Sequence, residues 1–155
     1  MITRLLVEHD QILRTLNFLE MQYLDLCRGG IPDYSLMQSV LEYIQEYPEQ
    51  VHHPLEDKIY SILLERVDEV ELLQNLMEEH EELEALTRKL SESLKLLQSN
   101  TISSEDIKAQ LSTFLIKQRR HMYLEEELVH PLIVKVLTNS EWEQIQSSVP
   151  LYKGK

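Results

Sequence analysis

The chain has 155 residues, of which 43% are hydrophobic, and this is the size and composition of one ordinary domain with a single core. It carries 15 Lys and Arg residues against 27 Asp and Glu residues, a formal net charge of −12 at pH 7. A chain this acidic repels nucleic-acid phosphates and anionic membrane surfaces, whereas it attracts cations. We therefore expect one domain over 1–155 that binds neither nucleic acid nor a membrane.

The chain carries little that points to secretion or to a membrane. The single cysteine, Cys27, excludes an internal disulfide and a cysteine-rich metal site. The first residues are apolar for only a few positions before Glu8, His9 and Asp10, which is not the pattern of a signal peptide. No apolar run approaches the length that crosses a bilayer. These features predict a soluble protein of the cytoplasm.

Apolar side chains recur at intervals of three and four residues along most of the chain, which is the periodicity of helices that bury one face. The first predicted helix covers 2–28 and ends at Gly29 and Gly30. The second covers 34–66. It contains Pro48 and Pro54, and we expect it to bend or restart there because proline lacks an N–H group. The fold class predicted from this pattern is all-α.

Two further long helices and a short one follow. We expect helices at 70–98, 104–137 and about 140–147, with starts set by the pairs Asp68–Glu71, Ser103–Asp106 and Ser140–Glu143. Four long helices with short links predict an up-down-up-down four-helix bundle over about 2–137, followed by a short C-terminal helix.

The chain also repeats a pattern of histidines and acidic residues. Residues 5–13 align with 76–84, and residues 52–63 align with 121–132. The alignment pairs His9 with His80, His52 with His121 and Glu56 with Glu125. Two similar helical hairpins therefore make up the predicted bundle, with histidines at equivalent places in each.

Two of these histidines have a carboxylate four residues later, so His52 shares a helix face with Glu56, as His121 does with Glu125. The apolar neighbours, Leu128 among them, indicate that these faces turn inward. His9 and His80 lie early in their helices, while the two pairs lie late in theirs. In an antiparallel bundle, all of these side chains meet at one end of the core.

Four imidazoles and two carboxylates are too many ligands for one zinc ion. They fit two ions side by side, with bridging carboxylates, a bridging oxygen and room for an external ligand. This donor set favours iron, with manganese or zinc as the other candidates. The predicted metal ligands are His9, His52, Glu56, His80, His121 and Glu125.

The motifs EHD at 8–10, HHPLED at 52–57, EEH at 78–80 and HMYLEEE at 121–127 occur in an order that resembles the hemerythrin-like, or HHE cation-binding, family. The resemblance covers about residues 1–137. It implies a four-helix bundle around a non-haem centre of two iron ions with an oxo or hydroxo bridge, held by the same six side chains. Members of the family bind dioxygen, or act in oxygen, nitric oxide, peroxide or iron handling.

The sequence departs from the respiratory members at two places. Those proteins have a second histidine one turn before the one that matches His80, and here this position is Leu76. Their last helix also separates its histidine and carboxylate by five residues, whereas His121 and Glu125 are four apart. We expect one iron to have a more open coordination sphere, which argues against simple reversible oxygen carriage.

Two other histidines are expected to play lesser roles. His53 points about 100° away from His52 around the helix, which favours a position outside the ligand set or in solvent. His130 has no counterpart in the repeat, where Ser61 stands, so we interpret it as a packing residue.

A ferritin-like centre would use Glu-x-x-His on two helices. Such pairs occur as Glu49 with His52 and Glu127 with His130, but they are out of register with the repeat and would lie at different depths. We therefore reject the ferritin-like reading.

Three functions fit these observations to different degrees. The first is a di-iron protein that binds dioxygen, nitric oxide or peroxide for sensing, storage or iron handling. The second is a small di-iron enzyme that acts on peroxide or nitric oxide. The third is a metal-free bundle that binds another protein, and inward-facing histidines make it the least favoured.

Overall fold

The computed structural model describes residues 2–99 and 102–149, and within these ranges the chain forms helices and loops without a β-strand. The all-α prediction is confirmed. The elements in chain order are α1 (Ile2–Cys27), α2 (Tyr34–Glu46), the π-helical turn η1 (Pro48–His52), α3 (His53–Leu63), α4 (Val70–Gln98), α5 (Ser104–Leu124), the π-helical turn η2 (Glu125–Val129), α6 (His130–Val136) and α7 (Asn139–Ser148).

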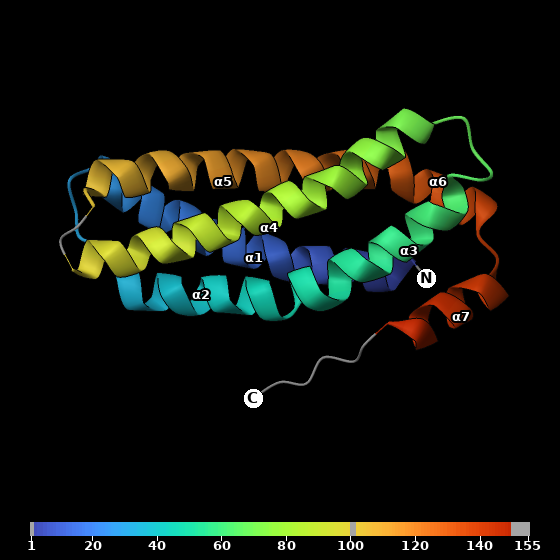
Figure 1. The fold of residues 1–155 in the computed structure, drawn as a ribbon, viewed down its shortest axis with the longest axis horizontal. Coiled ribbons are helices and arrows are strands. Elements are labelled where there is room, and N and C mark those ends of the chain that lie inside the picture. Colours follow the sequence, from blue (N-terminus) through green and yellow to red (C-terminus); the bar gives the residue numbers. More distant parts are fainter. Residues whose placement is uncertain (1, 100–101, 150–155) are drawn as a thin grey trace.

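Four long helical stretches lie side by side, and successive stretches run in opposite directions (Figure 1). These stretches are α1, α2 with η1 and α3, α4, and α5 with η2 and α6. Helix α1 contacts α2 and α5, and α4 contacts the same two helices. The short helix α7 packs against α3.

Most of the predicted helix boundaries agree with the structure. Gly29 takes a positive φ of 77° just past the end of α1, a backbone conformation that glycine adopts without strain. The side chain of Asp33 accepts a hydrogen bond from the Leu36 N–H and caps α2. Ser103 caps α5 by accepting from the Asp106 N–H.

Two predicted caps were wrong. Helix α4 starts after Glu69, which makes no capping hydrogen bond through its side chain, so the Asp68–Glu71 capping box does not form. Helix α7 is capped by Thr138 and Glu141, which make a complete capping box two residues before the predicted one. Near the start of each of these two helices, a polar residue is followed by an acidic residue three positions later. This spacing alone could not show at which residue the helix begins.

The predicted break in the second long helix is confirmed and takes the form of a π-turn. The His53 N–H bonds to the Pro48 carbonyl, five residues back instead of four. Pro54 follows immediately and has no N–H to continue the regular pattern. Helix α3 then restarts at His53.

The second π-turn, η2, was not predicted. The expected helix over 104–137 is interrupted where the His130 N–H bonds to the Glu125 carbonyl, directly before Pro131. One extra residue in a turn rotates everything after it by about 100° around the helix. The side chain of Leu128 is consequently 48% exposed, which contradicts the predicted inward position, and His130 is buried instead.

The buried apolar side chains form two clusters with a polar layer between them. On α1, Leu5 belongs to the first cluster, Ile12 belongs to the second, and His9 lies between them. Trp142 and Ile145 of α7 pack into the first cluster, so the C-terminal helix completes the core at that end. The polar layer is therefore enclosed by apolar packing above and below.

In the two described ranges, no helix combines the length and the apolar character needed to cross a membrane.

Candidate metal centre

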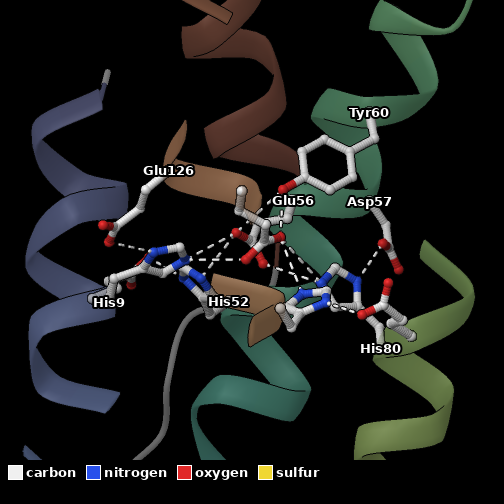
Figure 2. Close-up of polar contacts among 11 residues, drawn as sticks. His9, His52, Glu56, Asp57, Tyr60, His80 and Glu126 are labelled. Carbon is white, nitrogen blue, oxygen red and sulfur yellow. Dashed lines mark hydrogen bonds and ion pairs between the residues drawn. The ribbon is translucent and has the colours of Figure 1, made fainter. Parts of the chain in front are cut away.

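The polar layer contains all six side chains that the sequence predicted as metal ligands. They come from different elements, with His9 on α1, His52 on η1, Glu56 on α3, His80 on α4, His121 on α5 and Glu125 on η2. None of the six is more than 2% exposed. Figure 2 shows His9 and His52 on one side of Glu56 and His80 on the other.

The two carboxylates lie in the middle of the four imidazoles. The Oε2 atom of Glu56 is 3.2 Å from Nε2 of both His9 and His52, while its Oε1 atom is 3.2 Å from Nε2 of His80. Each oxygen of this carboxylate therefore faces a different side of the site. A carboxylate in this position has the geometry of a bridge between two cations.

Glu125 is placed in a similar way, but here the oxygen with two histidine neighbours faces His80 and His121. Its Oε1 atom is 3.3 Å from Nε2 of His9. Its Oε2 atom is 3.2 Å from Nε2 of His121 and 3.5 Å from Nε2 of His80. The site thus divides into a half around His9 and His52 and a half around His80 and His121, and both carboxylates contact both halves.

Several of these inner atoms are buried without a hydrogen-bond partner. They are the Nε2 atoms of His52, His80 and His121 and the Oε1 atom of Glu56. Each lies close to a donor or acceptor, yet the angles do not allow a hydrogen bond. Buried polar atoms are rarely left unpaired, because each costs the free energy of its lost hydration. A cation shared between these atoms would satisfy them. The buried donor atoms are therefore suited to bind a metal ion.

The spacing of the ligand atoms agrees with that interpretation. One ligand atom from each of Glu56, His80, His121 and Glu125 lies within 4.8 Å of the others, which is close enough to surround one ion. Among the described residues there is a second such group, made of His9, Glu56 and His130, while His52 belongs to neither group.

The outer nitrogen of every imidazole faces a second carboxylate. The distances from Nδ1 to the nearest such oxygen are 3.0 Å for His9 to Glu126, 3.0 Å for His52 to Glu8, 2.6 Å for His80 to Asp57 and 3.4 Å for His121 to Glu79. When Nδ1–H donates to a carboxylate, Nε2 keeps its lone pair for a metal ion and the ring is held in orientation. All four rings are therefore oriented as metal ligands require.

These outer carboxylates follow the internal repeat of the chain. Glu8 and Glu79 directly precede His9 and His80, while Asp57 and Glu126 directly follow Glu56 and Glu125. Every pair joins two different helical stretches, so the four hydrogen bonds link these stretches in a closed ring. The ring links the orientation of each ligand to the position of a neighbouring helix.

Two tyrosines extend the polar network. Tyr60 is fully buried and donates a short hydrogen bond to Oε2 of Glu125, while its hydroxyl lies 3.5 Å from Oε2 of Glu56. Tyr47 donates a short hydrogen bond to Glu8. Burial and the negative charges of Glu125 and Glu56 raise the Tyr60 pKa well above its ordinary value, so this hydroxyl remains a donor.

The electrostatics of the metal-free site are set by imidazoles and carboxylates together. Burial lowers the pKa of His9, but hydrogen bonds and charge from Glu125 and Glu56 outweigh burial and raise it to about 11. The same competition raises the pKa of His52 to about 8 and of His121 to about 9. Burial favours the neutral acid at Glu56 and Glu125, yet the imidazoles hold both pKa values well below their usual range. Protons therefore occupy the places that cations would take.

The residues interpreted as lying outside the ligand set are arranged differently from one another. His53 is 5% exposed and its ring stacks on His80, with centroids 4.2 Å apart and planes inclined by 10°. It is thus a buried neighbour of the predicted ligand His80. His130 is also 5% exposed and lies next to His9, closer to the centre than a packing residue would be.

The ferritin-like alternative does not match this geometry. Glu127 is exposed, and neither it nor Glu49 belongs to the clusters of possible ligands found in the described residues. The rejection of that alternative agrees with the structure.

Asp57 and Glu126 were not predicted as partners of the histidines. Their signal was the repeat itself, because the alignment of 52–63 with 121–132 places these two acids on one another. Because the chain has 27 Asp and Glu residues, these two could not be distinguished by sequence from acidic residues on the helix surfaces.

A search of curated proteins gave no match for this chain. The family model described as the hemerythrin HHE cation binding domain matches residues 1–133, and this range contains every inner and outer side chain of the centre. The chain belongs to the hemerythrin HHE cation-binding family.

Proposed function

We propose that the chain is an up-down-up-down four-helix bundle that holds two iron ions, with an oxo or hydroxo bridge, and uses them to bind a small ligand. The proposal depends chiefly on one observation, which is the convergence of four Nε2 atoms on two buried carboxylates that each face both halves of the site. Imidazole with carboxylate is a donor set that iron accepts readily, and manganese and zinc accept it too.

One ion would be held by His9 and His52 and the other by His80 and His121, with Glu56 and Glu125 shared between them. When bound, two iron ions supply a centre that takes up a small ligand and exchanges electrons with it. The outer carboxylates hold each Nδ1 proton, and the apolar clusters on both sides keep bulk water from the layer.

The ligand we propose is dioxygen, nitric oxide or peroxide, in a sensing, storage or iron-handling role. The enclosed layer between two apolar clusters favours a ligand of this size over an organic substrate. The acidic composition of the chain supports binding of cations and gives no support to a nucleic-acid partner.

The experiment that tests the proposal is metal analysis of the freshly purified protein together with its absorption spectrum. We expect about two iron ions per chain and the near-ultraviolet absorption of a bridged ferric pair. In His121→Ala we expect the iron content to fall and the thermal stability to drop, because bound metal stabilises the folded state by mass action. Tyr123→Ala, on the same helix with a 62% exposed side chain, is the matched control. Unchanged iron in His121→Ala would remove this residue from the ligand set.

A small di-iron oxidoreductase that acts on peroxide or nitric oxide is the second candidate. Leu76 favours it, because this buried side chain occupies the position one turn before His80 and offers no metal ligand. Adding dioxygen and then peroxide to the ferrous protein distinguishes the two functions. A spectrum that returns on removing the gas supports ligand binding, whereas catalytic consumption of peroxide supports the enzyme.

A further inference from the structure

His130 is a buried histidine beside the centre that the six-ligand set does not include. It is the first residue of α6, directly after η2, and its side chain is 5% exposed. Its ring lies next to that of His9, with centroids 5.4 Å apart and planes inclined by 32°. Its Nε2 atom is buried and has no hydrogen-bond partner among the described residues.

The position of His130 relative to the carboxylate also matters. One ligand atom from each of His9, Glu56 and His130 lies within 4.8 Å of the other two. Ligand atoms about 2.1 Å from one octahedral ion are about 3 to 4.2 Å apart. The 4.8 Å limit within which the metal-free ligand atoms lie is close to this range.

We infer that His130 is a seventh ligand, which binds the same ion as His9 and His52. This inference rests on the proposed di-iron centre and refines it. The ion near His9 then has three imidazoles, whereas the ion between His80 and His121 has two. The open coordination position for a small ligand belongs to the second ion.

The π-turn explains why His130 can take this place. In an uninterrupted helix, a residue nine positions after His121 lies on the opposite face, at about 180°. The additional residue in η2 reduces this difference to about 80°, which turns His130 toward His9. The same rotation moves Leu128 to the surface.

His53 provides a built-in comparison. It also starts a helix after a π-turn, is followed by a proline, and is as buried as His130. Its ring, however, stacks face to face on His80, with the ring centroids 4.2 Å apart. His53→Ala therefore removes a buried imidazole next to the site without removing a proposed ligand.

The test measures release of iron from the anaerobic ferrous protein into an excess of a strong chelator. For the natural sequence we expect two ions per chain. In His130→Ala we expect one of them to leave at least about tenfold faster while the other leaves at an unchanged rate. We expect His53→Ala to change neither rate. Glu126→Gln, which loosens His9, should accelerate the same ion as His130→Ala and so assign it.

Added imidazole gives a second readout, because a free imidazole can coordinate the ion in place of the missing side chain. We expect it to slow release from His130→Ala and to leave His53→Ala unaffected. Two unchanged rates in His130→Ala, or equal acceleration of both, would overturn the assignment of His130 while leaving the di-iron proposal intact. Failure of the unaltered protein to bind two ions would overturn the di-iron proposal and this inference with it.

Discussion

Glu8 and His52 are joined by a hydrogen bond of 3.0 Å between Oε1 and Nδ1, although they are 44 residues apart in the chain. The bond links α1 to η1 and fixes the orientation of one inner imidazole from outside the ligand set. Glu79 and His121 make the corresponding contact in the second half of the repeat, at 3.4 Å. The outer carboxylates therefore orient the inner imidazoles, and through them they would act on a bound metal ion.

This relationship predicts the effect of Glu8→Gln on metal binding. The amide keeps the shape of the side chain but loses the charge that makes Nε2 of His52 a strong ligand. We expect the affinity for iron to fall about 10- to 100-fold, as measured by competition with a chelator of known affinity. Asp10→Asn, two residues further along α1 and exposed, should leave the affinity unchanged. Equal affinities in both variants would show that the outer carboxylate has no influence on the metal.

Some residues of this centre could be placed from the sequence, and others could not. Helical periodicity and the His-x-x-x-Glu spacing were sufficient for the six inner residues, because each depends on a regular helix or on the residue four positions away. Leu128 and His130 were misplaced because Leu128 lies within η2 and His130 directly follows it, and one inserted residue exchanges inward and outward positions. Pro131 was the available signal, since proline forces the preceding carbonyls to find other donors. Pairings such as Asp57 with His80 required three-dimensional contacts that spacing does not contain.

A second prediction concerns Tyr60, whose hydroxyl donates to Glu125 in the fully buried layer. Tyr60→Phe keeps the packing of the ring but leaves a buried carboxylate with one donor fewer. We expect the metal-free protein to lose about 1.5 to 3 kcal/mol of unfolding free energy, measured by denaturant titration. Tyr123→Phe removes an exposed hydroxyl and should cost less than about 0.5 kcal/mol. If Tyr60→Phe lost less than about 0.5 kcal/mol of unfolding free energy as well, the hydrogen bond to Glu125 would be contradicted.

A third prediction is that metal reverses the pH dependence of stability. In the metal-free protein the folded-state pKa values of His52 and His121 are raised to about 8 and 9, above the ordinary value of 6.5. Such groups stabilise the fold fully below pH 6.5, and their contribution is lost as the pH rises through 8 and 9. We therefore expect the unfolding free energy of the metal-free protein to fall between pH 6.5 and about 9.5.

The metal-loaded protein should behave in the opposite way, because a metal ion binds only the neutral imidazole and must displace its proton. Raising the pH over the same interval should then increase both the affinity for metal and the stability. Denaturation at a series of pH values, with and without a saturating redox-inert ion such as Zn²⁺, measures the two slopes. Parallel slopes would mean that the titrating imidazoles are not the groups that bind the metal.

A last prediction concerns Glu49, which lies outside the centre. Its Oε2 atom is buried without a hydrogen-bond partner. Burial and the negative charge of Glu84 raise the Glu49 pKa to about 7, although the Thr87 side chain acts to lower it. A carboxyl group whose folded pKa is raised favours the folded state only when protonated, so this group costs stability as the pH rises from about 4.5 to 7.

Glu49→Gln removes that charge, and we expect it to stabilise the protein at pH 8 by on the order of 1 to 2 kcal/mol, after allowance for partial exposure of the group. The gain should shrink as the pH falls and vanish below about 4.5, where Glu49 is protonated in both the folded and unfolded states. Glu42→Gln, on the exposed face of α2, is the control and should show no such pH dependence. Denaturant titrations of both variants at pH 4.5, 6 and 8 measure the difference. A constant difference at all three values would contradict the idea that Glu49 is a destabilising buried charge.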